Sequence, residues 1–356
     1  MTAQTSMTPG PANAITDVAG ITVGSAEDSK RPTGTTVVMA ARPVTAAAAV
    51  TGGAPGTRGV TILQDGSIET GVDAVVLSGG SAYGLDAVGG AMDVLRRAGR
   101  GYAMGPARVP IIPGAIIFDL LTGSSAAAPT GWEQPPWFDL GRRAAEEALA
   151  GNTTLPLGNA GAGLGARAGG VKGGQGTASL IWSSGSSGGR TVTTAAIAVA
   201  NPIGRVLVPG SRAFWAAPFE RNGEFGAVPM PAGPLPADAL DFPFEFFSTG
   251  TATTLAVVAT TLDLTRGQCA RVARMAHDGF ARAIRPVHTR FDGDSVFVLA
   301  TGETPVENPV ADTARAGMMA ADCIARAIAR GVHAATAIPG MPAWRDLDDD
   351  GVPKTG

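Results

Sequence analysis

The pattern of apolar and polar positions predicts strands and helices that follow one another without a regular alternation. Strands are expected at 20–28, 34–43, 74–80, from 115 onward, and at 191–204, 251–264 and 292–302. Helices are expected at 84–101, 139–151, 264–284 and 313–331, and residues 205–250 resemble a long surface excursion. Because the order lacks a strict strand–helix–strand rhythm, it favours a layered α+β sandwich over a doubly wound parallel sheet.

Segment 251–264, "TATTLAVVATTLDL", is the clearest strand in the chain. Its apolar residues fall on both faces, with Leu255 and Val257 on one and Ala256 and Val258 on the other. This pattern is typical of a strand covered on both sides. The strand nevertheless opens with hydroxyl side chains, including Thr253, and packing alone does not require them there.

Composition excludes several classes of protein. The 356 residues carry a net charge of −3 with no basic stripe, which argues against a nucleic-acid partner. The two cysteines, Cys269 and Cys323, lie in helical patterns and are expected to be small core residues. We find no secretory signal and no apolar run of the roughly 18–20 residues that a membrane span needs. A cytoplasmic protein without membrane contact is expected.

The domain organisation is predicted to be simple. No internal repeat and no linker is visible, so residues 15–341 are expected to form one domain. Residues 1–14 are expected to be disordered, and residues 342–356 to form a flexible acidic tail.

Motifs for cofactors and metals fail in their contexts. "GLGARA" (163–168) fits a dinucleotide-binding pattern, but no helix follows it and no acid occurs between Glu147 and Glu220. "DLDDDG" (346–351) starts like a calcium loop, whose twelfth position would be residue 357. The three histidines have no ligand spacing. Neither a cofactor nor a metal is predicted.

Two side chains are candidate nucleophiles. Ser81 follows a buried strand in "GGSAYG" and could use His288 as a base, although a tight glycine turn explains the motif as well. Thr253 offers another route, because a threonine at a new N-terminus can use its own α-amine as base. The amine, with a pKa of roughly 7.7–8, is partly unprotonated at neutral pH. The same hydroxyl can create that terminus by attacking the preceding carbonyl, although a packed strand start remains the simpler explanation of two threonines.

Nine segments in order decide between these alternatives. They are "RPTGTTVV" (31–38), "GGAPGTR" (52–58), "LSGGSAYGLDA" (77–87), "VPIIPGAIIFDL" (109–120), "GNAGAGLGA" (158–166), "GGVKGG" (169–174), "VANPIG" (199–204), the strand at 251–264 and residues 276–302. Together they resemble the P1 peptidase family over roughly residues 15–305. That family includes L-aminopeptidase/D-amidase-esterases, β-peptidyl aminopeptidases and the nylon-oligomer endohydrolase, and ornithine acetyltransferases share its fold class.

The resemblance implies a four-layer αββα sandwich and an N-terminal-nucleophile hydrolase that cuts itself. The matching position is Thr253, so cleavage between Ala252 and Thr253 would give an α chain (1–252) and a β chain (253–356). Family sequences often have Asn where this chain has Ala252. Self-association of the α/β heterodimers, as a homotetramer, is also implied.

Further site residues carry over by position. Asn201 is expected to stabilise an oxyanion, and Lys172 to lie near the new α-amine or hold a hydroxyl. Asp292 and Asp294 are expected to hold the threonine hydroxyl and amine, or a substrate amine. Each has a purely structural alternative. Asn201 could form a turn at the end of its strand, and Lys172 could be a solvated loop lysine. The two aspartates could belong to a tight Asp-Gly-Asp turn.

Phe118 and Tyr83 are the residues predicted for the substrate pocket. Phe118 stands where nylon-hydrolase-like members have Tyr, so the phenolic hydroxyl is missing there. Tyr83 has such a hydroxyl and is near Phe118 in the sequence, which does not require the two to be close in space. The expected function is hydrolysis of short peptides, amino-acid amides or esters. The alternatives are an acyltransferase of the same fold, a 6-aminohexanoate-oligomer hydrolase, and an uncut small-molecule-binding protein.

Overall fold

The computed structural model describes residues 6–68, 71–123, 134–184, 189–235, 237–243 and 252–354. Its strands are β1 (Ser6–Thr8), β2 (Ile21–Asp28), β3 (Thr33–Val50), β4 (Thr57–Arg58), β5 (Val72–Ser78), β6 (Tyr102–Met104), β7 (Ala107–Val109), β8 (Gly114–Ile116), β9 (Arg167–Ala168), β10 (Val171–Lys172), β11 (Gly174–Ser183), β12 (Thr191–Ala200), β13 (Leu255–Leu262) and β14 (Ser295–Thr304). Its α-helices are α1 (Asp86–Arg97), α2 (Trp137–Leu149), α3 (Arg266–Ala276), α4 (Asp278–Ala283) and α5 (Pro309–Ala334).

Two stacked sheets share the long strand β3. Its first half pairs with β2 and β5, and residues 45–50 pair antiparallel with β14. The first sheet continues as β14, β13, β12, β11 and β1, and the second as β5, β8 and β4. The pairing of β3 with β5 is irregular between Met39 and Val44, where the strand passes from one sheet to the other. Prediction from the sequence ended this strand near residue 43.

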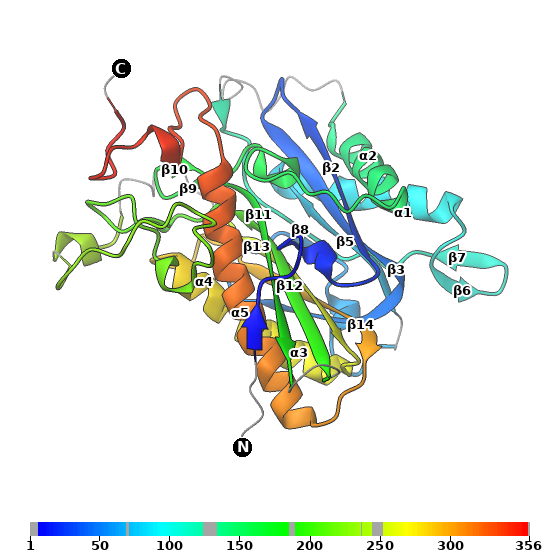
Figure 1. The fold of residues 1–356 in the computed structure, drawn as a ribbon. Helices are drawn as coiled ribbons and strands as arrows, with labels where there is room; N and C mark the ends of the chain where they lie inside the picture. Colours follow the sequence, from blue (N-terminus) through cyan, green and yellow to red (C-terminus); the bar gives the residue numbers. More distant parts are fainter. Residues whose placement is uncertain are drawn as a thin grey trace.

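Helices cover both outer faces, which makes four layers (Figure 1). One apolar cluster packs α3, α4 and α5 on the first sheet, a second fills the space between the sheets, and a third lies under α1 and α2. In β13, Leu255 and Val257 belong to the cluster between the sheets, and Ala256 and Val258 to the one under the helices. The expected αββα sandwich and the two faces of segment 251–264 are therefore confirmed.

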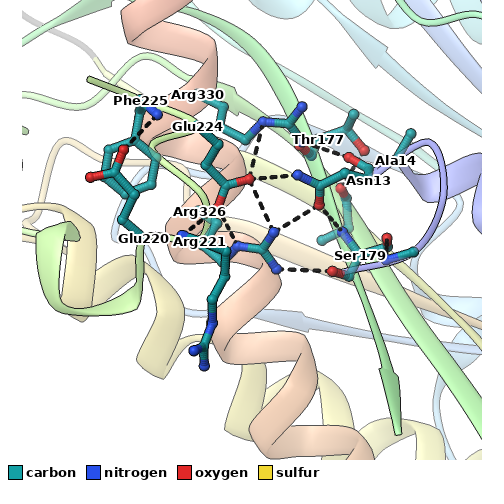
Figure 2. Close-up of polar contacts among 12 residues, drawn as sticks. Asn13, Ala14, Thr177, Ser179, Glu220, Arg221, Glu224, Phe225, Arg326 and Arg330 are labelled. Carbon is teal, nitrogen blue, oxygen red and sulfur yellow. Dashed lines mark hydrogen bonds and ion pairs between the residues drawn. The ribbon is translucent and has the colours of Figure 1, made fainter. Parts of the chain in front are cut away.

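Both ends of the chain contact distant segments. Strand β1 pairs with β11, and Asn13 enters a buried polar cluster with Arg326 of α5 (Figure 2). Near the other end, Trp344 is buried and stacks on Phe214, with ring centroids 6.0 Å apart. The sequence pattern did not indicate these contacts, and the disorder expected at 1–14 and the flexible tail expected at 342–356 stay predictions.

The helical interpretations need smaller corrections. The single helix expected at 264–284 is two helices, α3 and α4, that meet at His277. Both cysteines are free and buried, as expected. None of the helices in the described ranges is both long and apolar enough to cross a membrane.

Candidate active site

Thr253 lies two residues before the first residue of β13. The residue is 3% exposed, so its hydroxyl is enclosed by protein. The hydroxyl donates to the carbonyl oxygen of Ala252 over 2.6 Å, and the Thr253 amide donates to the carbonyl of Asn201 over 2.8 Å. The threonine hydroxyl therefore lies against the peptide group that the predicted self-cleavage would break.

Gly293 contributes a backbone donor to the same peptide group. Its N–H donates to the carbonyl oxygen of Ala252 over 3.0 Å and to the hydroxyl oxygen of Thr253 over 3.2 Å. An N–H aimed at a carbonyl oxygen stabilises the negative charge that develops there when the carbon is attacked. A Cβ at residue 293 would lie 2.6 Å from the Thr253 hydroxyl oxygen, so the approach requires glycine.

Gly293→Ala is expected to slow self-cleavage at least tenfold, because the added methyl displaces the hydroxyl from its position beside the carbonyl. A time course of fragment appearance on a denaturing gel measures the rate. Gly267→Ala in α3 is the matched control, since a Cβ added there would meet no described atom within 4 Å. Equal rates for Gly293→Ala and the wild type would contradict the role given to Gly293.

Asp292 and Asp294 flank this glycine and occupy different environments. Asp294 accepts three N–H hydrogen bonds, from Thr254, from the backbone of His288 and from the His288 ring, at 2.7, 3.1 and 2.7 Å. Asp292 accepts from the backbone of Thr289 over 2.7 Å. Burial raises the pKa of Asp292 to about 6, and the negative charge of Asp294 adds to this rise. Of the pair, Asp292 is thus the carboxyl placed to exchange a proton near neutral pH.

Asn201 follows β12 directly and lines a pocket. Its side-chain oxygen accepts from the Arg167 amide over 2.9 Å, which directs the NH₂ group the other way, 3.4 Å from the carbonyl oxygen of Phe118. The pocket is lined by Phe118, Asp119, Leu121, Thr122, Arg167, Gly169, Gly170, Asn201, Pro202, Ile203, Ala252 and Met341. The predicted oxyanion donor, the predicted pocket residue Phe118 and the predicted cleavage site therefore lie around one space.

Lys172 supports the glycine-rich loop from inside. The side chain is fully buried, and its ammonium donates to the carbonyls of Gly163, Ala166 and Gly173 at 2.9–3.0 Å. Burial lowers its pKa to about 7, against the opposing effect of Asp119. Lys172 is therefore not the exposed loop lysine of the structural alternative, and its expected place near the new α-amine, or at a hydroxyl, stays a prediction.

Tyr83 and Ser81 lie away from this arrangement. Tyr83 is half exposed, stacks on Trp137 with centroids 6.1 Å apart and is not among the residues that line the Asn201 pocket, so its predicted role at the substrate has no support from this pocket. Ser81 belongs to the same short helical turn, and no hydrogen bond joins it to His288 within the described residues. The structure thus offers no support for a Ser81–His288 pair.

Gly293 and the role of His288 beside Asp294 were missed by sequence reasoning. The Asp-Gly-Asp sequence was the available signal for Gly293, since a glycine between two candidate carboxylates leaves room for close backbone approach. No sequence pattern indicated the contact of the His288 ring with Asp294, because that contact depends on the left-handed backbone conformation of His288.

Curated relatives resemble the chain over most of its length. An uncharacterized aminopeptidase of Mycobacterium tuberculosis is 40% identical over 354 residues, covering 94% of this chain and 98% of the relative. A 6-aminohexanoate-oligomer endohydrolase of Kocuria sp. is 29% identical over 289 residues, covering 81% and 74% respectively.

Solved structures share the fold at lower identity. The L-aminopeptidase D-Ala-esterase/amidase of Ochrobactrum anthropi, described as a variant of the Ntn hydrolase fold, has a TM-score of 0.64 at 21% identity, covering 96% of this chain and 92% of that one. A β-aminopeptidase of Burkholderia sp. has a TM-score of 0.61 at 22% identity, covering 92% and 88%.

The family assignment rests on a family model that matches most of the chain. The model of peptidase family S58 matches residues 13–344, which include Asn201, Thr253 and the two aspartates. The expected family resemblance is confirmed, and the chain belongs to peptidase family S58.

Proposed function

We propose that this protein is a self-processing amide hydrolase with Thr253 as its N-terminal nucleophile. One observation carries the proposal: the Thr253 hydroxyl lies 2.6 Å from the carbonyl oxygen of Ala252, and the Gly293 N–H donates to both groups. A hydroxyl that is hydrogen-bonded to the oxygen of a carbonyl is held beside the carbon that it would attack, and the N–H donor on the same oxygen would stabilise the charge that develops there.

Self-cleavage then proceeds in two steps. The Thr253 oxygen bonds to the carbonyl carbon of Ala252, the hydroxyl proton passes to the Thr253 nitrogen, and the carbon–nitrogen bond breaks to leave an ester. Water hydrolyses the ester, which gives residues 1–252 a new carboxylate and residues 253–356 a free α-amine. Asp292, the carboxyl whose pKa is raised to about 6, is placed beside these transfers.

Turnover uses the same groups on a bound substrate. The α-amine of Thr253 takes the hydroxyl proton, and the oxygen attacks the substrate carbonyl. The Asn201 NH₂ group stabilises the oxyanion, and its backbone carbonyl, which accepts from the Thr253 nitrogen, orients the amine. The leaving amine takes a proton, and water releases the acyl group from Thr253.

The substrates proposed are short peptides, amino-acid amides or esters with a free amine. The names of two relatives, an uncharacterized aminopeptidase and a 6-aminohexanoate-oligomer endohydrolase, support amide-bond hydrolysis. Phe118 at the pocket brings an apolar ring to this space. A cytoplasmic location and a homotetramer of α/β heterodimers stay predictions.

Intact mass spectrometry of the purified protein tests the proposal directly. We expect two species, corresponding to residues 1–252 and 253–356, together with release of the chromogenic amine from amino-acid anilides. A single full-length species that persists for days would contradict self-processing. An added amine acceptor separates the rival function, since an acyltransferase would give more transfer product than hydrolysis.

A further inference from the structure

His288 is a largely buried histidine in the segment between α4 and β14. Its ring Nδ1 lies 2.7 Å from Asp294 Oδ2, and its backbone N–H donates to the same oxygen over 3.1 Å. The ring is about one-fifth exposed. Its backbone has a φ of 56°, in the left-handed region that few side chains adopt. The conformation folds the residue back so that ring and backbone reach one carboxylate oxygen.

Asp294 connects this histidine to the nucleophile. The other carboxylate oxygen accepts the N–H of Thr254 over 2.7 Å, so Asp294 fixes the residue that follows Thr253. Gly293, whose N–H donates to the Thr253 hydroxyl oxygen, is its direct neighbour in the chain. Any shift of the Asp294 carboxylate is therefore transmitted to both sides of the threonine.

We propose that His288 is a positioning residue that, through Asp294, sets the orientation and charge balance of the two carboxylates beside Thr253. This inference rests on the proposed function. Among the described residues, the hydrogen bonds of His288 go to Asp294, and His288 does not line the Asn201 pocket, so its effect passes through the Asp294 contact.

The charged and titratable groups around His288 determine how this residue changes the charge of the two aspartates. Asp294 faces its ring, Asp292 is two residues before Asp294 in the chain, and His277 packs against the ring from the α3–α4 junction with centroids 4.9 Å apart. His277 bonds to the carbonyl of Ala49, and burial lowers its pKa. Asp278 lies close enough to act on His277 from the start of α4, and the apolar ring of Phe280 lies 5.9 Å from the His288 ring, centroid to centroid.

The direction of the charge effect follows from these neighbours. The negative charge of Asp294 raises the pKa of Asp292. The hydrogen bond from the His288 ring to Asp294, over 2.7 Å, holds part of that charge and so favours ionised Asp292. Removing the imidazole leaves the Asp294 charge uncompensated, and Asp292 then needs a higher pH to ionise.

The test compares His288→Asn and His288→Gly, both of which suit a left-handed backbone. Asparagine keeps a short N–H donor without a titratable ring, and glycine removes the donor. In both variants the acid limb of kcat/KM against pH is expected to move upward by roughly half a unit. At the optimum pH, kcat of His288→Gly is expected to fall about tenfold with KM changed less than about twofold, and His288→Asn to recover part of the loss.

His333→Asn is the matched control, because this histidine packs on Trp344 far along the chain in α5, and its pH profile should equal that of the wild type. Thermal midpoints show whether each variant is folded. A folded variant that also cuts itself more slowly supports the inference, since the same carboxylates flank the cleaved peptide.

Measurements on the wild type distinguish a failure of the proposed function from a failure of the positioning role. If the wild-type chain neither cuts itself nor hydrolyses amides, the proposed function fails. If the wild type does both, and folded His288→Asn and His288→Gly keep its kcat and its acid limb, the positioning role alone is overturned.

Discussion

Thr253→Ala is expected to leave one intact chain of 356 residues without amide hydrolase activity. The substitution removes the only hydroxyl that donates to the Ala252 carbonyl in the described part of the chain, and with it the attacking atom. Without cleavage no α-amine forms at residue 253, so base and nucleophile are lost together. We expect activity to fall by at least about 10³-fold, the loss typical of a removed nucleophile. Intact mass and anilide hydrolysis measure the two effects separately.

Thr253→Ser should cut slowly, because serine keeps the hydroxyl but lacks the methyl group that restricts rotation about χ1. The neighbouring threonine supplies the control. The Thr254 hydroxyl is buried with no hydrogen-bond partner among the described residues, so Thr254→Val preserves the shape of the strand start and should still cut. Fragments from Thr253→Ala with the wild-type masses would show that another group breaks the chain.

The strand behind Thr253 was predictable because its pattern is local. Side chains alternate across a strand, so Leu255 and Val257 had to face one layer and Ala256 and Val258 the other. The order of the motifs then placed Thr253, Asn201 and the two aspartates in one family site. The structure brings all of these groups around the Ala252–Thr253 peptide.

Other features depend on contacts that no local pattern contains. Lys172 sits in a glycine-rich sequence that is typical of an open loop, yet its ammonium is enclosed by three carbonyls of that loop. Trp344 stacks on Phe214 and β1 pairs with β11, and in each case more than a hundred residues separate the two partners in the sequence. His288 reaches Asp294 through a left-handed backbone that its residue type does not indicate.

Glu224→Ala is expected to cause the largest loss of stability outside the active site. The Glu224 carboxylate accepts two hydrogen bonds from Arg326, at 2.6 and 3.0 Å, and lies 3.4 Å from Arg330 (Figure 2). The side chain of Arg326 is only 1% exposed and that of Glu224 is 8% exposed. Asn13 completes the cluster, donating to Glu224 over 2.6 Å and accepting from Arg326 over 2.7 Å.

The expected cost is about 3–5 kcal/mol in the free energy of unfolding, because the substitution leaves a buried guanidinium without its counter-charge. Urea unfolding in the uncut Thr253→Ala background measures it on a single chain. Glu146→Ala is the control: this glutamate pairs with Arg142 at the surface, is 48% exposed, and should change stability by less than about 1 kcal/mol. The double variant Glu224→Met with Arg326→Met should recover part of the loss, since no unpaired charge remains at residue 326. Equal losses for Glu224→Ala and Glu146→Ala would contradict a structural role for the buried pair.

Self-cleavage gives this cluster a second consequence. Glu224 and Asn13 would belong to the chain of residues 1–252, whereas Arg326 and Arg330 would belong to the chain of residues 253–356. The ion pair then crosses between two polypeptides, as does the antiparallel pairing of β12 with β13. Glu224 also holds the segment after β12 against α5, because its carboxylate accepts from the Arg221 amide as well. In the processed protein, Glu224→Ala should therefore lower the urea concentration at which the two chains separate, and Glu146→Ala should leave it unchanged.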